Sequence, residues 1–212
     1  MARGFPRFYV DADVMMGPDT IRTLARRLDR GDVLAAAPTA DIDLFGCSWL
    51  VRRYYDIRSR LPSAREGVGG SGVYAVSEQG RSRFGEFPFL TADDTYVRLQ
   101  FMPAERVTLP EARSTIYPPR GVTQLIAIRT RVHRGTFELI RLFPDLQANN
   151  GEQNDRALLA LFLKPRLWPG LLIYCWVNLL AKRRAAKHVE SGADLWPRDD
   201  SSRIVLSAGP GK

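Results

Sequence analysis

Cysteine and histidine are scarce in this sequence. Its 212 residues include two cysteines and two histidines. Two cysteines cannot form the disulfide framework of a small secreted protein, so we expect a reducing compartment. The histidines, His133 and His188, do not provide a Cys/His zinc site. Any metal ion would then be held by carboxylates, which favours a divalent cation such as Mg²⁺ or Mn²⁺.

Lysine is also scarce, because the basic excess consists of arginine. The chain has 27 Arg and 4 Lys against 23 Asp and Glu, which gives a net charge of +8. The planar guanidinium suits phosphate groups. The excess therefore indicates nucleic acid, a membrane surface or an anionic substrate, unless it reflects codon usage. Aromatic residues are not interleaved with the basic ones, as stacking on nucleic acid requires, so we expect no nucleic-acid partner.

We find no internal repeats and expect no signal peptide, and short apolar runs alternate with amphipathic stretches. The pattern predicts strands at 8–10, 33–37, 73–76, 106–109 and 114–117, and helices at 18–31, 48–62, from 93 onward and at 122–142. Such alternation is typical of α/β layers. We expect residues 1–144 to form the folded domain and the polar residues 145–156 to form a linker.

The chain becomes apolar near its C-terminus, over 157–163 and 167–181, with Lys164-Pro165-Arg166 between the two runs. The longer run is shorter than the roughly 20 residues that a bilayer-spanning helix needs. Basic residues lie on both sides of it, which does not fit one clean crossing. We predict that 157–187 is a membrane-associated helical segment, either lying in the interface or bent into a re-entrant hairpin, with a buried core helix as the alternative. A polar tail, 188–212, follows.

Two carboxylates one residue apart, Asp11 and Asp13, follow the first predicted strand and precede a helix. Ligands bind at the ends of strands in α/β sheets, and such a pair can chelate a divalent cation together with its phosphates. Asp41 and Asp43 have the same spacing, but they follow Ala-Pro-Thr-Ala and are interpreted as a turn. Asp11 and Asp13 are therefore the candidate metal ligands.

A second acidic pair, Asp93 and Asp94, begins the short predicted helix. Like charges this close raise the pKa of one carboxyl, which suits a general base. The alternative is that acidic residues only stabilise a helix N-terminus. The glycine-rich loop 67–72 is the candidate wall of a cleft beside this pair.

Three arginines lie on the long predicted helix. Arg131 and Arg134 are three residues apart and share a face, whereas Arg129 points about 160° away from Arg131. Arg131 and Arg134 are a candidate clamp for a diphosphate close to the metal ion. A solvated basic face is the alternative.

Taken in order, these motifs resemble the family 2 glycosyltransferases of the GT-A fold. The resemblance covers about residues 8–203 and rests on Asp11-Ala12-Asp13, Gly69-Gly70-Ser71-Gly72-Val73-Tyr74-Ala75-Val76, Thr91-Ala92-Asp93-Asp94 and Arg129-x-Arg131-x-x-Arg134-Gly135. It implies an α/β fold: a partial GT-A (Rossmann-like) mixed sheet with flanking helices, followed by the membrane-associated apolar segment. Residues 1–144 would be the acceptor and catalytic half of that domain.

The resemblance also implies inverting transfer of a sugar from a nucleotide-sugar donor to an acceptor hydroxyl. Asp13 and Asp11 would hold the Mg²⁺ or Mn²⁺ on the donor diphosphate, Arg131 and Arg134 would steady that diphosphate, and Asp94 would be the catalytic base. The substrate-binding residues would be Asp93, Gly70, Ser71 and Gly72. The implied acceptor is a glycan or lipid-linked molecule of the cell envelope, at the cytoplasmic side of the cell membrane.

Two features depart from the family. No Trp follows the arginines, as it does in the Gln/Arg-x-x-Arg-Trp motif of processive synthases, which argues against a processive polymerase. Family members also carry strands ahead of the Asp-x-Asp strand that hold the nucleotide, where this chain has ten residues. We therefore expect this chain to bind the donor weakly or not at all. Either its start is misassigned, or its gene is truncated and the chain is inactive, or another chain supplies the nucleotide-binding strands.

Two other functions stay open. A haloacid-dehalogenase-type phosphatase also begins with a strand into Asp-x-Asp, but it needs a Lys before its second acidic motif, and the first Lys here is Lys164. Alternatively, the chain is a non-catalytic fragment that binds a membrane or a partner protein through 157–187.

Overall fold

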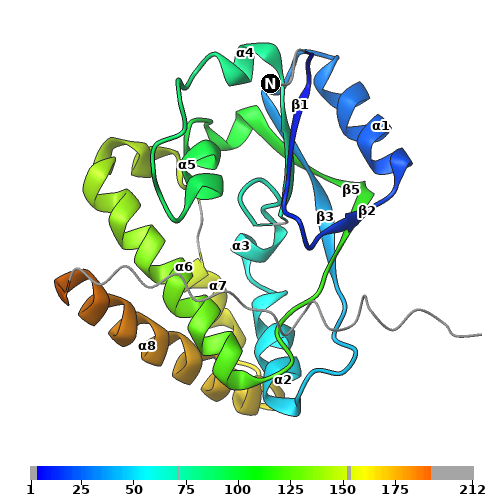
Figure 1. The fold of residues 1–212 in the computed structure, drawn as a ribbon. Helices are drawn as coiled ribbons and strands as arrows, with labels where there is room; N and C mark the ends of the chain where they lie inside the picture. The colour runs from blue at the N-terminus through cyan, green and yellow to red at the C-terminus, as the bar shows by residue number, and fades with distance from the viewer. Residues whose placement is uncertain (1–3, 71, 152–153, 192–212) are drawn as a thin grey trace, which may run out of the picture.

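The computed structural model describes residues 4–70, 72–151 and 154–191, and it shows a mixed five-stranded sheet beside a layer of helices (Figure 1). The strands lie in the order β1 (Arg7–Val10), β4 (Val73–Val76), β3 (Ala35–Ile42), β5 (Arg106–Ile116) and β2 (Met15–Met16). β3 and β5 are parallel, and the other neighbouring pairs are antiparallel. The predicted mixed α/β sheet with flanking helices is confirmed.

Both faces of the sheet are covered, because successive side chains of a strand point to opposite faces. On one face, Phe8 of β1 packs with Leu24 and Leu28 of α1 (Pro18–Leu28). On the other face, Tyr9 of β1 packs in a cluster with Val97 of α5 (Asp93–Leu99). Four short helical segments connect these elements: α3 (Pro62–Arg65), α4 (Glu78–Arg81), η1 (Pro103–Glu105) and η2 (Pro144–Asn149).

Three longer helices form the second layer, below the sheet in Figure 1. They are α2 (Trp49–Arg58), α6 (Val122–Leu142) and α8 (Trp168–Ser191), with α7 (Asn154–Phe162) and η3 (Pro165–Leu167) completing the chain. Their shared core contains Val51, Tyr54, Leu125 and Val177. A Cβ added to Gly170 would lie 3.0 Å from Ile57 Cγ1 and 3.4 Å from Arg53 O, so α8 runs close to the backbone of α2.

The strands differ from the sequence prediction in length. The runs 106–109 and 114–117 belong to one strand, β5, and the strand predicted at 33–37 extends to Ile42 across a bulge between Pro38 and Thr39. Asp41 lies inside β3, opposite Thr115, and forms an ion pair with Arg113. The interpretation of Asp41 as a turn residue was wrong, because this residue is extended through pairing with β5, which lies far away in the sequence.

The predicted linker contains η2, whose Asn149 donates to Leu99 O at 2.9 Å through its side chain. The predicted tail begins inside α8, and residues 192–212 lie outside the described residues. The division of the chain into domains stays a prediction.

The apolar C-terminal segment folds as two helices. Within the described residues, no single helix has the length and apolar composition of a membrane span. α7 and α8 reach that threshold together, but they are bent by 107° at the break between them. One side of α8 belongs to the core, because Leu171, Val177 and Ala181 are fully buried.

Candidate active site

The end of β1 lies against the glycine-rich loop. Asp11 N donates to Gly72 O at 2.8 Å. Gly72 has a φ of 65°, and a Cβ at this position would lie 2.6 Å from Val14 Cγ2 and 3.0 Å from Asp11 Oδ2. Both the left-handed conformation and the close approach require glycine. The loop residue predicted to bind substrate therefore lies beside a predicted metal ligand.

The second acidic pair is held between the same loop and α6. A Cβ on Gly135 of α6 would lie 3.0 Å from Ala92 Cβ and 3.1 Å from Ala92 N, so α6 runs close to the residue that precedes Asp93. On the loop side, a Cβ on Gly69 would lie 3.2 Å from Asp94 O, at a φ of 84°. Two glycines thus set the place of the N-terminus of α5.

Asp11, Asp13, Asp93 and Asp94 form one electrostatic group, which we call the acidic cluster. The pKa of Asp11 is raised to about 6, first by partial burial and then by the negative charges of the other three. Gly72 lies against one side of the Asp11 carboxyl, although the side chain keeps exposed surface. The two acidic pairs, 80 residues apart in sequence, therefore lie within range of each other's charge.

Asp94 has the features of a positioned base. Its Oδ1 accepts from Thr95 N at 2.6 Å and from Thr95 Oγ1 at 3.2 Å. Burial raises the pKa of Asp94, and the Asp93 charge adds to that rise, while the bonds from Thr95 lower it. A fixed carboxyl with a raised pKa is a better proton acceptor at neutral pH.

Aromatic side chains that were not among the predicted site residues line the same face of the sheet. Tyr9 and Tyr74 stack with ring centroids 4.9 Å apart, and Phe87 lies 5.4 Å from Tyr9. Burial raises the pKa of the Tyr74 hydroxyl, and the charges of Asp93 and Asp94 raise it further. Tyr74 therefore lies beside the acidic cluster as a neutral phenol. Its position two residues after Gly72 in a strand was the available signal.

The arginines separate as their helical spacing predicted. Arg131 lowers the pKa of Asp11 and so acts on the acidic cluster. Arg129 instead faces α8, where its Nε donates to Asn178 Oδ1 at 3.4 Å, and burial lowers its pKa. Arg134 is half-buried beside Gly135. That Arg131 and Arg134 bind a diphosphate stays a prediction.

The remaining loop residues lie differently. A Cβ on Gly70 would lie 2.8 Å from Glu66 O, so this glycine is needed for the turn of the loop itself. Ser71 lies outside the described residues. The substrate-binding roles predicted for Gly70 and Ser71 stay predictions.

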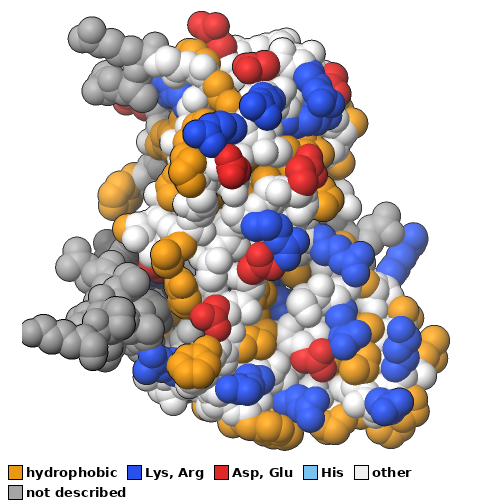
Figure 2. Space-filling view, turned by 90° about the vertical axis from the view of Figure 1, so that its right-hand side faces the viewer, with side chains coloured by type: hydrophobic (Ala, Val, Ile, Leu, Met, Phe, Trp, Pro, Cys, Tyr) orange, Lys and Arg blue, Asp and Glu red, His pale blue; other side chains and the backbone are white. Residues whose placement is uncertain are grey.

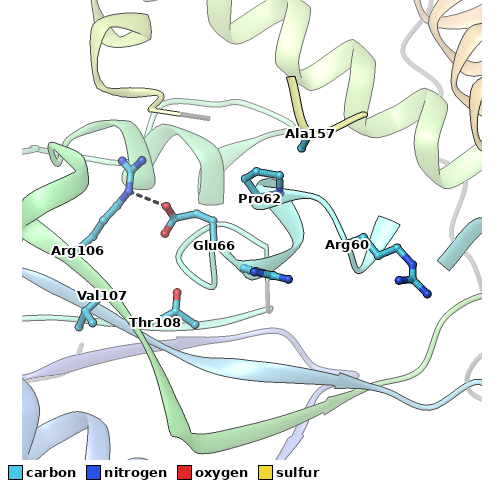
Figure 3. A pocket seen from close by; sticks show the side chains of 8 residues that line it. Arg60, Pro62, Glu66, Arg106, Val107, Thr108 and Ala157 are labelled. Carbon is cyan, nitrogen blue, oxygen red and sulfur yellow. Dashed lines mark hydrogen bonds and ion pairs between the residues drawn. The ribbon is translucent and has the colours of Figure 1, made fainter. Parts of the chain in front are cut away.

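Arg106, which was not among the predicted site residues, holds the elements around the site together. Its guanidinium is 1% exposed and pairs with Glu66, whose carboxylate lies 3.1 Å from Nε (Figure 3). It also donates to the carbonyls of Arg98, Phe101, Asn149 and Asn150 at 2.8–3.1 Å. One side chain thereby connects the start of the glycine-rich loop, the end of α5 and η2.

Arg106 and Glu66 also line a pocket of about 480 Å³ (Figure 3). The other residues that line it are Arg60, Pro62, Arg65, Val107, Thr108 and Ala157. Gly67 N donates to Thr108 Oγ1 at 2.8 Å at its edge. The pocket shares no residue with the acidic cluster. It is therefore not the site that the motifs predicted.

The carboxylates suit a hard divalent cation in part. Among the described residues, no group of three or more His, Cys, Asp or Glu side chains is arranged as a complete metal site. Asp11 and Asp13 offer two carboxylates, and Mg²⁺ is commonly held by one or two carboxylates plus substrate phosphates. The negative charge that raises the pKa of Asp11 would be offset by such a cation. The donor set therefore fits a cation that is bound together with a phosphate ligand.

No known protein family and no curated protein matches this sequence. Among solved structures, the chain is similar to a mannosyltransferase from Pyrobaculum calidifontis in complex with GDP-mannose and Mn²⁺. The identity is 19% and the TM-score is 0.44, over 94% of this chain and 53% of the other. The chain thus spans about half the length of that protein.

Proposed function

We propose that this chain carries the acceptor side of a glycosyltransferase site of the family 2 type and transfers a sugar from a nucleotide-sugar to an acceptor hydroxyl. The acidic cluster carries this proposal. Two carboxylate pairs from separate elements meet at a glycine-rich loop, and partial burial together with their repulsion raises the pKa of Asp11 to about 6. Carboxylates gathered at such a cost are typical of sites that bind a cation or move a proton.

Each residue has a separate role in the proposed transfer. Asp11 and Asp13 would hold Mg²⁺ or Mn²⁺ with the donor diphosphate, and that cation would supply positive charge at the leaving group. Asp94 accepts the proton of the acceptor hydroxyl while the oxygen of that hydroxyl bonds to the anomeric carbon of the sugar. The bond from that carbon to the diphosphate breaks on the opposite face, and the diphosphate leaves with the electron pair. Arg131, beside Asp11, faces the negative charge that departs.

The acceptor that we propose is a glycan or lipid-linked molecule of the cell envelope, used at the cytoplasmic side of the cell membrane. Two observations support it. The basic excess of the chain suits a phosphate-rich surface, and large apolar side chains are exposed on the outer side of α8.

Asp94→Asn tests the base assignment. We expect the rate of transfer to fall roughly 100-fold or more, because general base catalysis is lost. Whatever donor binding the unaltered chain shows in the presence of Mn²⁺ should persist, because Asp11 and Asp13 remain. Transfer is measured by mass spectrometry with a panel of nucleotide-sugars and envelope lipid extract, and binding by calorimetry.

Asp19→Asn is the matched control, because Asp19 is an exposed aspartate on α1 that pairs with Arg22. It should leave transfer unchanged. A rate close to that of the unaltered chain in Asp94→Asn would show that Asp94 is not the base. No transfer by the unaltered chain with a donor that it binds would contradict the proposed activity itself.

A further inference from the structure

α8 presents a stripe of large apolar side chains to the outside of the molecule. Trp168, Leu172, Trp176 and Leu179 are 53%, 70%, 49% and 53% exposed. Their spacing of four, four and three residues places them within about 80° of one another around the helix. The fully buried residues of α8 lie on the opposite side: Leu171, Val177, Ala181 and Ala185. The four exposed side chains, which we call the apolar stripe, are therefore a second face of a helix whose first face is already packed.

The corner between α7 and α8 extends this apolar surface. Leu159 and Leu163 are 70% and 82% exposed, and Phe162 is 42% exposed. Trp168 Nε1 donates to Phe162 O at 2.9 Å, which ties the end of α7 to the start of the stripe. Exposed apolar patches of this kind mark surfaces that bind something.

The charge around the stripe indicates what it binds. Residues 157–187 contain six Lys and Arg and no Asp or Glu. Lys164 and Arg166 precede the stripe, and Arg183, four residues after Leu179, continues its line and is exposed. At the lower end of Figure 2, where the helical layer lies, hydrophobic side chains reach the surface beside Lys and Arg. An apolar middle with two tryptophans and basic ends complements the interface of a bilayer with anionic headgroups.

We propose that the apolar stripe of α8 docks on an anionic lipid bilayer, with the helix lying in the plane of the interface. The stripe runs for about 17 Å along the helix, whereas the hydrocarbon core of a bilayer is about 30 Å thick. The opposite side of α8 is packed against α2 and α6, so only the outer side is free to enter the headgroup region. This surface is separate from the acidic cluster, and the proposal does not depend on sugar transfer.

The test is binding of the full 212-residue chain to vesicles of phosphatidylcholine with and without phosphatidylglycerol, measured by co-sedimentation. We expect binding to the vesicles that contain phosphatidylglycerol. Leu172→Glu should weaken it roughly tenfold or more, because a charge then enters the acyl boundary. Arg183→Glu should weaken it roughly fivefold on anionic vesicles only. Circular dichroism checks that both variants stay folded, which the exposure of these side chains favours.

Ile21→Glu is the matched control, because Ile21 is 40% exposed on α1, on the other side of the molecule in Figure 1. It should bind vesicles like the unaltered chain. Failure of the unaltered chain to bind, or equal loss in Ile21→Glu and Leu172→Glu, would overturn the proposal. The proposal would also be overturned if sedimentation velocity showed a dimer that Leu172→Glu dissociates while vesicle binding is absent, because the stripe would then bind a second copy of the chain.

The orientation of the helix is tested by fluorescence. Lipids brominated near the headgroup should quench tryptophan fluorescence more than lipids brominated at the chain ends, and the reverse order would exclude the in-plane orientation.

Discussion

The Asp11 carboxyl has a pKa of about 6, against 3.8 in its ordinary state, because of partial burial and three neighbouring carboxylates. A carboxyl whose pKa is raised by folding contributes stability at low pH that is lost as the pH rises through the folded pKa. At neutral pH the ionised Asp11 therefore destabilises the fold. The acidic cluster is an arrangement that stability alone would not favour.

Asp11→Asn should stabilise the free protein. We expect the free energy of unfolding to rise by on the order of 1 kcal/mol at pH 7.5. This figure is discounted for solvent screening, because the side chain keeps exposed surface. The gain should shrink toward pH 4.5, where Asp11 is protonated in the folded state. Urea unfolding at both pH values measures it, with Asp19→Asn as the control. A variant less stable than the parent at pH 7.5 would contradict the repulsion on which the proposed site rests.

His133 should show the opposite pH dependence. Burial and the charge of Arg129 lower its pKa to about 4, and its Nε2 lies 3.3 Å from Asn178 Oδ1. Because the unfolded state takes up the proton first, its contribution to stability is complete above pH 6.5 and is lost as the pH falls toward 4. The free energy of unfolding of the parent falls between pH 7 and pH 4.5, and His133→Gln should make that fall smaller by about 2 kcal/mol. Parallel losses in parent and variant would show that His133 is not the cause.

At this scale, the acidic pairs could be predicted because strand, turn and helix signals lie next to them in sequence. Asp11 directly follows an apolar run, and Asp93 begins an amphipathic one. Arg106 could not be predicted, because its partners come from Glu66 and Asn149, 40 and 43 residues away. Tyr74 and Tyr9 each lie in a predicted strand, but nothing local in the sequence predicted that they pair with each other.

The positions of the glycine-rich loop, α5 and η2 depend on Arg106. Its buried guanidinium pairs with Glu66 and donates to four backbone carbonyls. Arg106→Met keeps the length of the side chain but leaves these acceptors without a donor inside the protein. We expect a loss of about 3 kcal/mol in the free energy of unfolding, because a buried pair is broken on one side.

Arg83→Met is the comparison for this prediction, because Arg83 also pairs with a glutamate, Glu105, but lies nearer the surface. It should cost less than about 1 kcal/mol. Urea denaturation of both variants gives the difference. Equal losses would mean that Arg106 acts as an ordinary surface ion pair, and that it does not hold the loop and α5 together.

Element prediction succeeded where the signal is periodic and failed where it depends on a partner. The helix predicted at 122–142 has the bounds observed for α6, because its apolar spacing persists over its whole length. β3 was predicted five residues too short at its end, because Thr39–Ile42 is extended only through pairing with β5 beyond the bulge. Pro110 lies within β5, between the two runs that were predicted as separate strands.

In the whole molecule, α8 belongs to the helical core with one side and offers the apolar stripe with the other. The sequence prediction placed membrane contact and a buried helix as alternatives for 157–187. The arrangement of α8 accommodates both, because burial changes with every one or two residues around a helix. Composition alone could not separate the two sides, since leucine occurs on each.

Leu171 and Leu172 are adjacent, and they separate these two sides in one experiment. Leu171 is fully buried between α8 and α2, whereas Leu172 is 70% exposed. Leu171→Ala should cost about 3 kcal/mol, because it leaves a cavity in the helical core, and Leu172→Ala should cost less than about 0.5 kcal/mol. Thermal and urea unfolding of the full chain measure both in the absence of lipid. If Leu171→Ala were as mild as Leu172→Ala, α8 would not be part of the folded core. The stripe could then not be treated as the outer face of a packed helix, whereas the expected contrast leaves Leu172 free for a contact outside the chain.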